Sequence, residues 1–199
     1  MSEKKIVVNI YAESTPNEAA MKFVSDYCLL EKDYNLEFNS SDEALNISPL
    51  ATELFQFPFV KSVHITPFFI TVIKNETATW DSISLHLREI IRDFISRGIP
   101  ALVSPDEIPE RTKEAIEYTP ETNDETSKKI MEILDEYIRP AVEGDGGTIQ
   151  FRSFYDGVVK VGLGGSCNGC PSTTVTLKGG VERLLAQMLP GVVKEVIAV

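Results

Sequence analysis

The segment spanning residues 104–126 constrains the fold of this chain more than any other feature. Its sequence, SPDEIPERTKEAIEYTPETNDET, contains three prolines and many carboxylates, and its few apolar residues do not form a sustained face. Low hydrophobicity and repulsion between like charges favour an extended linker. We therefore expect the 199-residue chain to form two small domains, residues 1–103 and 127–199, joined by an acidic linker over residues 104–126.

Charge and hydropathy exclude some functions. The formal net charge of −11 argues against binding nucleic acid, because phosphate binding depends on Lys and Arg releasing counterions. No apolar run approaches the roughly 20 residues that a membrane span needs, so no membrane association is expected. The N-terminus has neither the long apolar core of a secretory signal nor the Arg-rich character of a transit peptide, and we therefore expect a cytoplasmic protein.

Residues 1–103 show both strand-like and helix-like patterns. A helix is expected after the capping pair Ser48-Pro49, and a long amphipathic helix runs from Trp80 to Ile95. Strand-like runs occupy residues 6–11, 34–38, 59–65 and 68–74. Residues 20–30 are ambiguous, because their apolar positions have helical spacing while strand-favouring residues are common among them. His64 and His86 are isolated in the sequence, so this domain is expected to be α+β without a catalytic cluster.

Residues 127–199 predict the order α-β-β-α-β, a second small α+β domain. The first helix presents its apolar face over residues 130–142, and Pro140 kinks or ends it. Asp156-Gly157 is a strong two-residue hairpin signal between two strand-like runs. A second helix face over residues 177–188 precedes a last strand at 192–199.

The chain has three cysteines, Cys28, Cys167 and Cys170. An odd, small number in a chain without a secretory signal does not indicate a disulfide framework, and such cysteines are more often metal-binding or redox-active. Cys28 stands in the apolar sequence YCLL, so we expect it to be buried as a small hydrophobic residue. Cys167 and Cys170 are therefore the candidates for chemistry.

These two cysteines lie in the sequence GGSCNGCP, residues 164–171, between an expected strand and the second helix. Their spacing lets both sulfurs turn to one side, and Gly169 permits a backbone conformation that a side chain would disfavour. Pro171 suits the first position of a helix. Both sulfurs are thus expected near the positive end of a helix dipole, which favours the thiolate that binds metal.

Metal chemistry with two sulfurs requires a second chain. An iron–sulfur cluster or a structural zinc normally has four protein ligands, and residues 104–199 contain no histidine. Two chains in a symmetric pair would supply four thiolates, in a shallow site that is open to solvent and suited to releasing its contents. A thiol–disulfide oxidoreductase, which also places Cys-x-x-Cys at the start of a helix, and a structural zinc remain as alternatives.

The order of motifs around the cysteines resembles the C-terminal domain of NifU, the Nfu-type iron–sulfur carrier domain. The matching residues are Leu134, Arg139-Pro140, Asp145-Gly146-Gly147, GGSCNGCPS at 164–172, Thr176-Leu177-Lys178, Val181-Glu182 and Pro190-Gly191-Val192. The first half is similar to the Nfu N-terminal domain, through Thr15-Pro16-Asn17, Lys22-Phe23, Ser48-Pro49-Leu50-Ala51, Leu54-Phe55, Phe69-Ile70-Thr71-Val72 and Trp80. This second resemblance implies that residues 20–30 begin as a strand.

The resemblance also implies a function. Cys167 and Cys170 of two chains would bind a labile [4Fe–4S] cluster, with [2Fe–2S] as the other form, at a homodimer interface. The cluster would come from upstream cluster assembly proteins and pass to apo iron–sulfur client proteins. The chain would be a scaffold or carrier and not an enzyme, and we expect no catalytic residues. The N-terminal domain would recognise clients or serve as a stabilising appendage.

Overall fold

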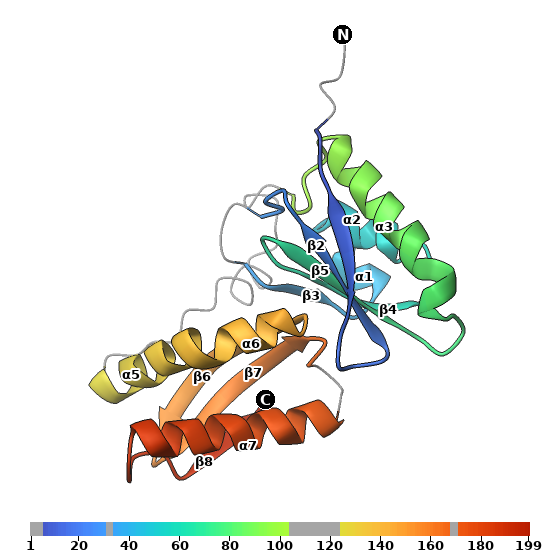
Figure 1. The fold of residues 1–199 in the computed structure, drawn as a ribbon. Helices are drawn as coiled ribbons and strands as arrows, with labels where there is room; N and C mark the ends of the chain where they lie inside the picture. Colours follow the sequence, from blue (N-terminus) through green and yellow to red (C-terminus); the bar gives the residue numbers. More distant parts are fainter. Residues whose placement is uncertain (1–5, 31–33, 104–123, 168–170) are drawn as a thin grey trace. The chain divides into compact units, whose positions relative to one another are not determined.

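The computed structural model describes residues 6–30, 34–103, 124–167 and 171–199. The chain divides into two compact units, Met1–Tyr118 and Thr119–Val199 (Figure 1). Residues 104–123, most of the expected linker, lie outside the described residues. The last residues of that expected linker belong to helix α5, Glu125–Ile133, whose N-cap is Asp124.

Unit 1 is an antiparallel sheet with helices. The sheet has five strands in the order β1-β2-β5-β4-β3. The strands are β1 (Ile10–Ser14), β2 (Ala20–Ser25), β3 (Leu36–Phe38), β4 (Val60–Ile65) and β5 (Phe69–Lys74). The helices are α1 (Ser41–Ala44), α2 (Pro49–Leu54) and α3 (Trp80–Ser96). An α+β domain was expected here, and the structure confirms it.

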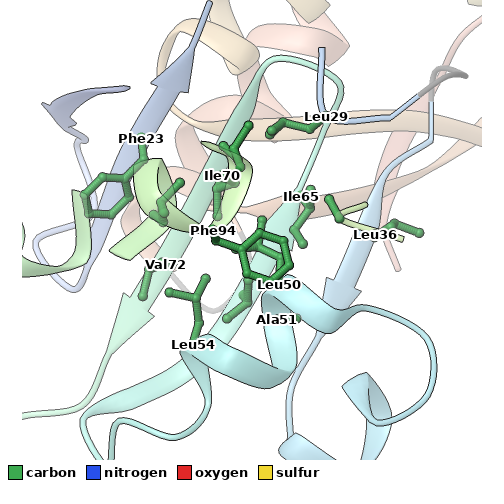
Figure 2. Close-up of a cluster of buried hydrophobic side chains, with 14 of the residues drawn as sticks. Phe23, Leu29, Leu36, Leu50, Ala51, Leu54, Ile65, Ile70, Val72 and Phe94 are labelled. Atoms are coloured by element: carbon green, nitrogen blue, oxygen red, sulfur yellow. The ribbon is translucent and has the colours of Figure 1, made fainter. Parts of the chain in front are cut away.

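The core of unit 1 forms where α2 and α3 meet the sheet (Figure 2). Helix α3 buries Leu87, Ile91 and Phe94, which recur at helical spacing, as the sequence pattern predicts. Ser48 joins two parts of this core. Its hydroxyl accepts a hydrogen bond from the Ala51 amide at 3.1 Å and donates one to the Ala101 carbonyl at 2.6 Å. The N-cap of α2 therefore also holds the segment that follows α3.

Two elements of unit 1 differ from the secondary structure that the sequence predicts, and a third settles an ambiguous segment. Strand β1 starts at Ile10 and not at Ile6, whose amide instead donates a hydrogen bond to the Ser96 carbonyl at 3.1 Å. The ambiguous run at 20–30 begins as strand β2, because its edges pair with β1 and β5. Helix α1 was not expected, although its N-cap Ser40 and the following Glu43 are a readable capping signal.

Unit 2 has the expected α-β-β-α-β order. Helix α5 continues through a π-helical turn, Leu134–Ile138, into α6, Arg139–Gly144. Pro140 lacks an amide hydrogen and its ring crowds the preceding turn, so the wider turn accommodates it without ending the helix. Strands β6 (Gly147–Tyr155) and β7 (Val158–Gly165), helix α7 (Pro171–Met188) and strand β8 (Glu195–Ala198) follow.

The sheet of unit 2 combines two kinds of pairing. Strands β6 and β7 form the expected hairpin, and Asp156 and Gly157 both adopt positive φ, at 47° and 81°, as a two-residue turn requires. Strand β8 then pairs with β7 in parallel, with α7 as the crossover. The central strand β7 therefore leads from the hairpin into a βαβ unit. None of the described helices is long and apolar enough to cross a membrane.

Candidate functional site

Cys167 lies at the junction between a strand and a helix. Strand β7 ends at Gly165, Cys167 follows two residues later, and α7 begins at Pro171. Cys170, the second expected ligand, lies outside the described residues, as do residues 168 and 169. The described geometry therefore concerns the first half of the Cys-x-x-Cys motif and the helix that follows the second half.

The side chain of Cys167 is buried. It is 2% exposed and belongs to the apolar core of unit 2 together with Val161, Ile149 and Val181. The expectation of a site that is shallow and open to solvent is therefore wrong for this half of the motif. The reason is tertiary: β6 and the turn before it lie against the residues that follow β7, and the spacing of the cysteines in the sequence carries no sign of that packing.

A turn before β6 holds the cysteine loop. The amide of Ser166 donates to the Gly146 carbonyl at 3.1 Å, and its hydroxyl donates to the Asp145 carbonyl at 2.6 Å. Gly146 and Gly165 have φ of 76° and 62°, a region that favours glycine because other residues meet steric strain there. Two hydrogen bonds and two left-handed residues thus fix the backbone next to Cys167.

Gly147 touches the cysteine directly. It pairs with Gly165 at the first position of the β6–β7 ladder. A Cβ atom on Gly147 would overlap Sγ of Cys167, and it would lie 3.2 Å from both Cβ of Cys167 and the Gly164 carbonyl oxygen. In the sequence, Gly144-Asp145-Gly146-Gly147 predicts only a turn of the chain. The sequence analysis missed this contact between Gly147 and Cys167, because no local sequence pattern predicts a contact between residues 20 positions apart.

Cys28 is exposed, so the expectation of a buried apolar cysteine is wrong. Strand β2 ends at Ser25, whose hydroxyl donates to the Tyr27 carbonyl and accepts from the Tyr27 amide. This turn directs Cys28 away from the core, while Leu29 and Leu30 are buried. The thiol of Cys28 donates to the Leu30 carbonyl at 3.0 Å. The apolar sequence around Cys28 therefore predicts the burial of Leu29 and Leu30 but not the exposure of Cys28 itself.

Neither histidine belongs to a metal-ligand group within the part of the chain that the structure describes. Histidine, cysteine, aspartate and glutamate form no cluster of three or more among the residues that the structure describes. His86 is exposed on α3, and its ring meets Phe57 edge to face. His64 is buried in β4, and burial lowers its pKa from 6.5 to about 4, so it is neutral at physiological pH.

Family comparison agrees with the division into two units. The family described as "Scaffold protein Nfu/NifU N terminal" matches residues 10–98, and the "NifU-like domain" family matches residues 130–197. The chain belongs to the Nfu/NifU family. The second match includes the turn at 145–147, strand β7 and the whole cysteine loop, so the buried Cys167 is part of the family's own domain.

Curated relatives support this assignment. A Drosophila willistoni protein named "NFU1 iron-sulfur cluster scaffold homolog, mitochondrial" is 40% identical over 183 residues, which cover 92% of this chain and 61% of the relative. The protein of the same name from Drosophila persimilis is 39% identical and is covered to 62%. The Nfu/NifU chain described here thus spans less than two thirds of the length of these relatives. A solution structure of a NifU-like protein from Saccharomyces cerevisiae is 28% identical, with a TM-score of 0.44, covering 52% of this chain and 90% of that one.

The relatives correct one expectation. Both Drosophila proteins are named as mitochondrial, which contradicts the cytoplasmic localisation expected from the N-terminal sequence. That expectation treated the absence of transit-peptide features in the first residues as informative. The start of this sequence carries no conclusion about where the protein resides.

Proposed function

We propose that two copies of this Nfu/NifU chain hold an iron–sulfur cluster between them through Cys167 and Cys170 of each copy, and transfer it to apo-proteins. The observation that supports this most directly is the place of the motif. Cys167 follows the central strand β7 at a hydrogen-bonded turn, and Cys170 immediately precedes the first residue of α7. One thiolate would therefore come from a backbone that hydrogen bonds hold in place, and the other from the residue that precedes an 18-residue helix in the sequence.

The number of ligands supports a shared cluster. Unit 2 has two cysteines and no histidine, whereas iron–sulfur clusters are usually held by four protein ligands. Cys28 is exposed in unit 1, three residues after the end of β2, and among the described residues it belongs to no group of three or more potential metal ligands. A second copy supplies the missing pair by symmetry, as in other cyclic dimers. We propose [4Fe–4S] as the cluster, with [2Fe–2S] as the other form.

The proposed role is that of a scaffold and carrier in mitochondria, and not that of an enzyme. The relatives carry the words "iron-sulfur cluster scaffold" in their names. A carrier needs a cluster that it can release, and a cluster shared between two chains is lost when the chains separate. Upstream assembly proteins would load the dimer, and apo iron–sulfur clients would receive the cluster.

Anaerobic reconstitution tests the proposal. The full chain is incubated with iron, sulfide and a thiol, and iron and sulfide are counted per chain. Mössbauer spectra identify the cluster, and the mass of the species is measured by light scattering. The proposal expects a brown dimer with one cluster for two chains, and transfer to an apo-ferredoxin or apo-aconitase followed by the recovery of the acceptor.

Other outcomes overturn the proposal in distinct ways. A colourless monomer with an internal Cys167–Cys170 disulfide that reduces insulin would identify a thiol–disulfide oxidoreductase. Zinc in the freshly purified dimer, without iron after reconstitution, would identify a structural zinc site. A cluster bound within one chain, or bound equally well without both motif cysteines, would contradict the shared site.

A further inference from the structure

We infer that Gly147 is a positioning residue for Cys167: its bare Cα forms the surface against which the sulfur rests, and it thereby sets the direction in which the sulfur is presented. This inference rests on the proposed function for its consequence in cluster binding. Its geometric basis, however, is independent of any cluster, because it concerns two described residues of one chain.

The first observation shows why residue 147 must be glycine: a side chain there would meet a steric clash, whereas the backbone conformation does not require glycine. Gly98, Gly146, Gly157, Gly165 and Gly191 have positive φ, and Gly147 is not among them. Alanine is therefore compatible with the backbone at Gly147. The cost of a side chain there comes from steric overlap, because a Cβ would overlap Sγ of Cys167 and lie 3.2 Å from the Gly164 carbonyl oxygen. Glycine is needed at residue 147 because a side chain would occupy the space that Sγ of Cys167 requires.

The second observation concerns what can move to relieve that overlap. The far side of the site is fixed, since Ser166 is hydrogen-bonded to Asp145 and Gly146. The Gly164 carbonyl lies 3.2 Å from the added Cβ, and backbone in a paired strand does not shift easily. Cysteine has one side-chain torsion that moves its sulfur. The sulfur is therefore the atom that must leave its position.

The other glycines of unit 2 show that this contact is specific. A Cβ on Gly144, at the end of α6 in the same connection, would meet nothing within 4 Å. The atoms nearest to a Cβ on Gly162 belong to the side chain of Arg152, which is long and flexible and can move away. Gly147 is the position in this group where a methyl group would press on a motif cysteine, so Gly144 and Gly162 provide matched controls.

The test compares Gly147→Ala with Gly144→Ala and Gly162→Ala in the full chain carrying Cys28→Ser. Each variant also carries Cys170→Ser, so that Cys167 is the one cysteine left to react. The native protein is treated with N-ethylmaleimide, and mass spectrometry follows the labelling of Cys167. Gly147→Ala should label several-fold faster than either control, because the sulfur has lost its buried position. Equal labelling rates in the three variants would overturn the inference.

The cluster gives the second readout. With Cys170 intact, Gly147→Ala should lose its reconstituted cluster to a chelator about tenfold faster than Gly144→Ala. Tenfold is the lower end of the loss expected when a residue that orients a metal ligand is mutated. Visible circular dichroism of the remaining cluster should also change. Val196→Ala, which creates a cavity in the core at β8, controls for lost stability.

The possible results separate three conclusions. If Val196→Ala matches Gly147→Ala in unfolding midpoint, chelator half-life and dichroism, then Gly147 acts only through stability and the inference is wrong. If Val196→Ala keeps the parent half-life and spectrum while Gly147→Ala loses its cluster faster and changes its spectrum, the positioning role is supported. If the parent chain binds no cluster, the proposed function fails, while the labelling rates still decide whether Gly147 positions Cys167.

Discussion

Nδ1 of His64 lies 4.0 Å from Oε2 of Glu37, its cross-strand neighbour on β3. Neither ring nitrogen of His64 has a hydrogen-bond partner in the part of the chain that the structure describes. The ring is 3% exposed, and its other cross-strand neighbour, Thr71, is fully buried. A buried imidazole in this setting resists protonation, which makes the stability of unit 1 depend on pH.

We predict that unit 1 loses stability as the pH falls from about 6.5 towards 4. Burial lowers the pKa of His64 from 6.5 to about 4 in the folded state, so the unfolded chain binds a proton that the folded chain does not. The contribution is fully present above pH 6.5 and is lost on acidification, amounting to roughly 1–3 kcal/mol. Denaturant midpoints at pH 7.5 and pH 5 measure it.

The control for this prediction is the exposed histidine on α3. His86→Gln should keep the pH dependence of the parent, whereas His64→Leu should flatten it whatever its effect on stability at pH 7.5. A His64→Leu variant with the same loss between the two pH values as the parent would show that another group is responsible.

Each motif cysteine should be essential for the cluster, and the third cysteine should not. Cys167→Ser and Cys170→Ser each remove one thiolate per chain and two per dimer, leaving half of the proposed ligands. Reconstituted Cys167→Ser and Cys170→Ser should retain little iron, measured per chain with a chelating dye. Cys28→Ser is the matched control, since this thiol is exposed and lies outside the Cys-x-x-Cys motif. Loss of the cluster in Cys28→Ser would reject the assignment of ligands.

Ser48→Ala should destabilise unit 1 by about 2–3 kcal/mol, because it removes a helix cap and leaves a buried carbonyl without its donor. The hydroxyl of Ser48 both caps α2 and binds the Ala101 carbonyl, and the residue is fully buried. Ser40→Ala removes only the cap of the short, surface helix α1 and should cost about 1 kcal/mol or less. Urea unfolding, followed by the fluorescence of Trp80, compares the two. Equal losses would show that the bond to Ala101 contributes nothing.

Gly179→Ala should stabilise unit 2. Gly179 lies inside α7, and a Cβ there would meet nothing within 4 Å, so the substitution gains helix propensity of about 0.5–1 kcal/mol without a clash. Gly157→Ala is the contrasting variant, since its φ of 81° and the side chain of Lys194 both oppose a methyl group. Thermal unfolding should place the midpoint of Gly179→Ala above the parent and that of Gly157→Ala below it. A cluster defect in Gly179→Ala would instead indicate that this helix surface is used in binding.

Much of this protein follows from local sequence. The helical spacing of Leu87, Ile91 and Phe94 predicts α3, because one face of a helix must be apolar to pack on a sheet. Asp156-Gly157 predicts the β6–β7 hairpin, because few residue pairs tolerate positive φ twice in succession. The α-β-β-α-β order, the two-domain α+β class and the place of the cysteines between a strand and a helix are determined in this way, by interactions among residues close in the chain.

Contacts between distant segments decided the rest. Cys28 is exposed and Cys167 is buried, the reverse of what their neighbouring residues suggest, because a turn directs the first thiol outward and β6 covers the second. The same packing brings Gly147 against a sulfur 20 positions along the sequence. Burial depends on which segments meet in space, and hydrophobic periodicity records only which face of an element is apolar. The motif therefore predicts the ligands of the proposed cluster, and the tertiary structure determines how Cys167 is held.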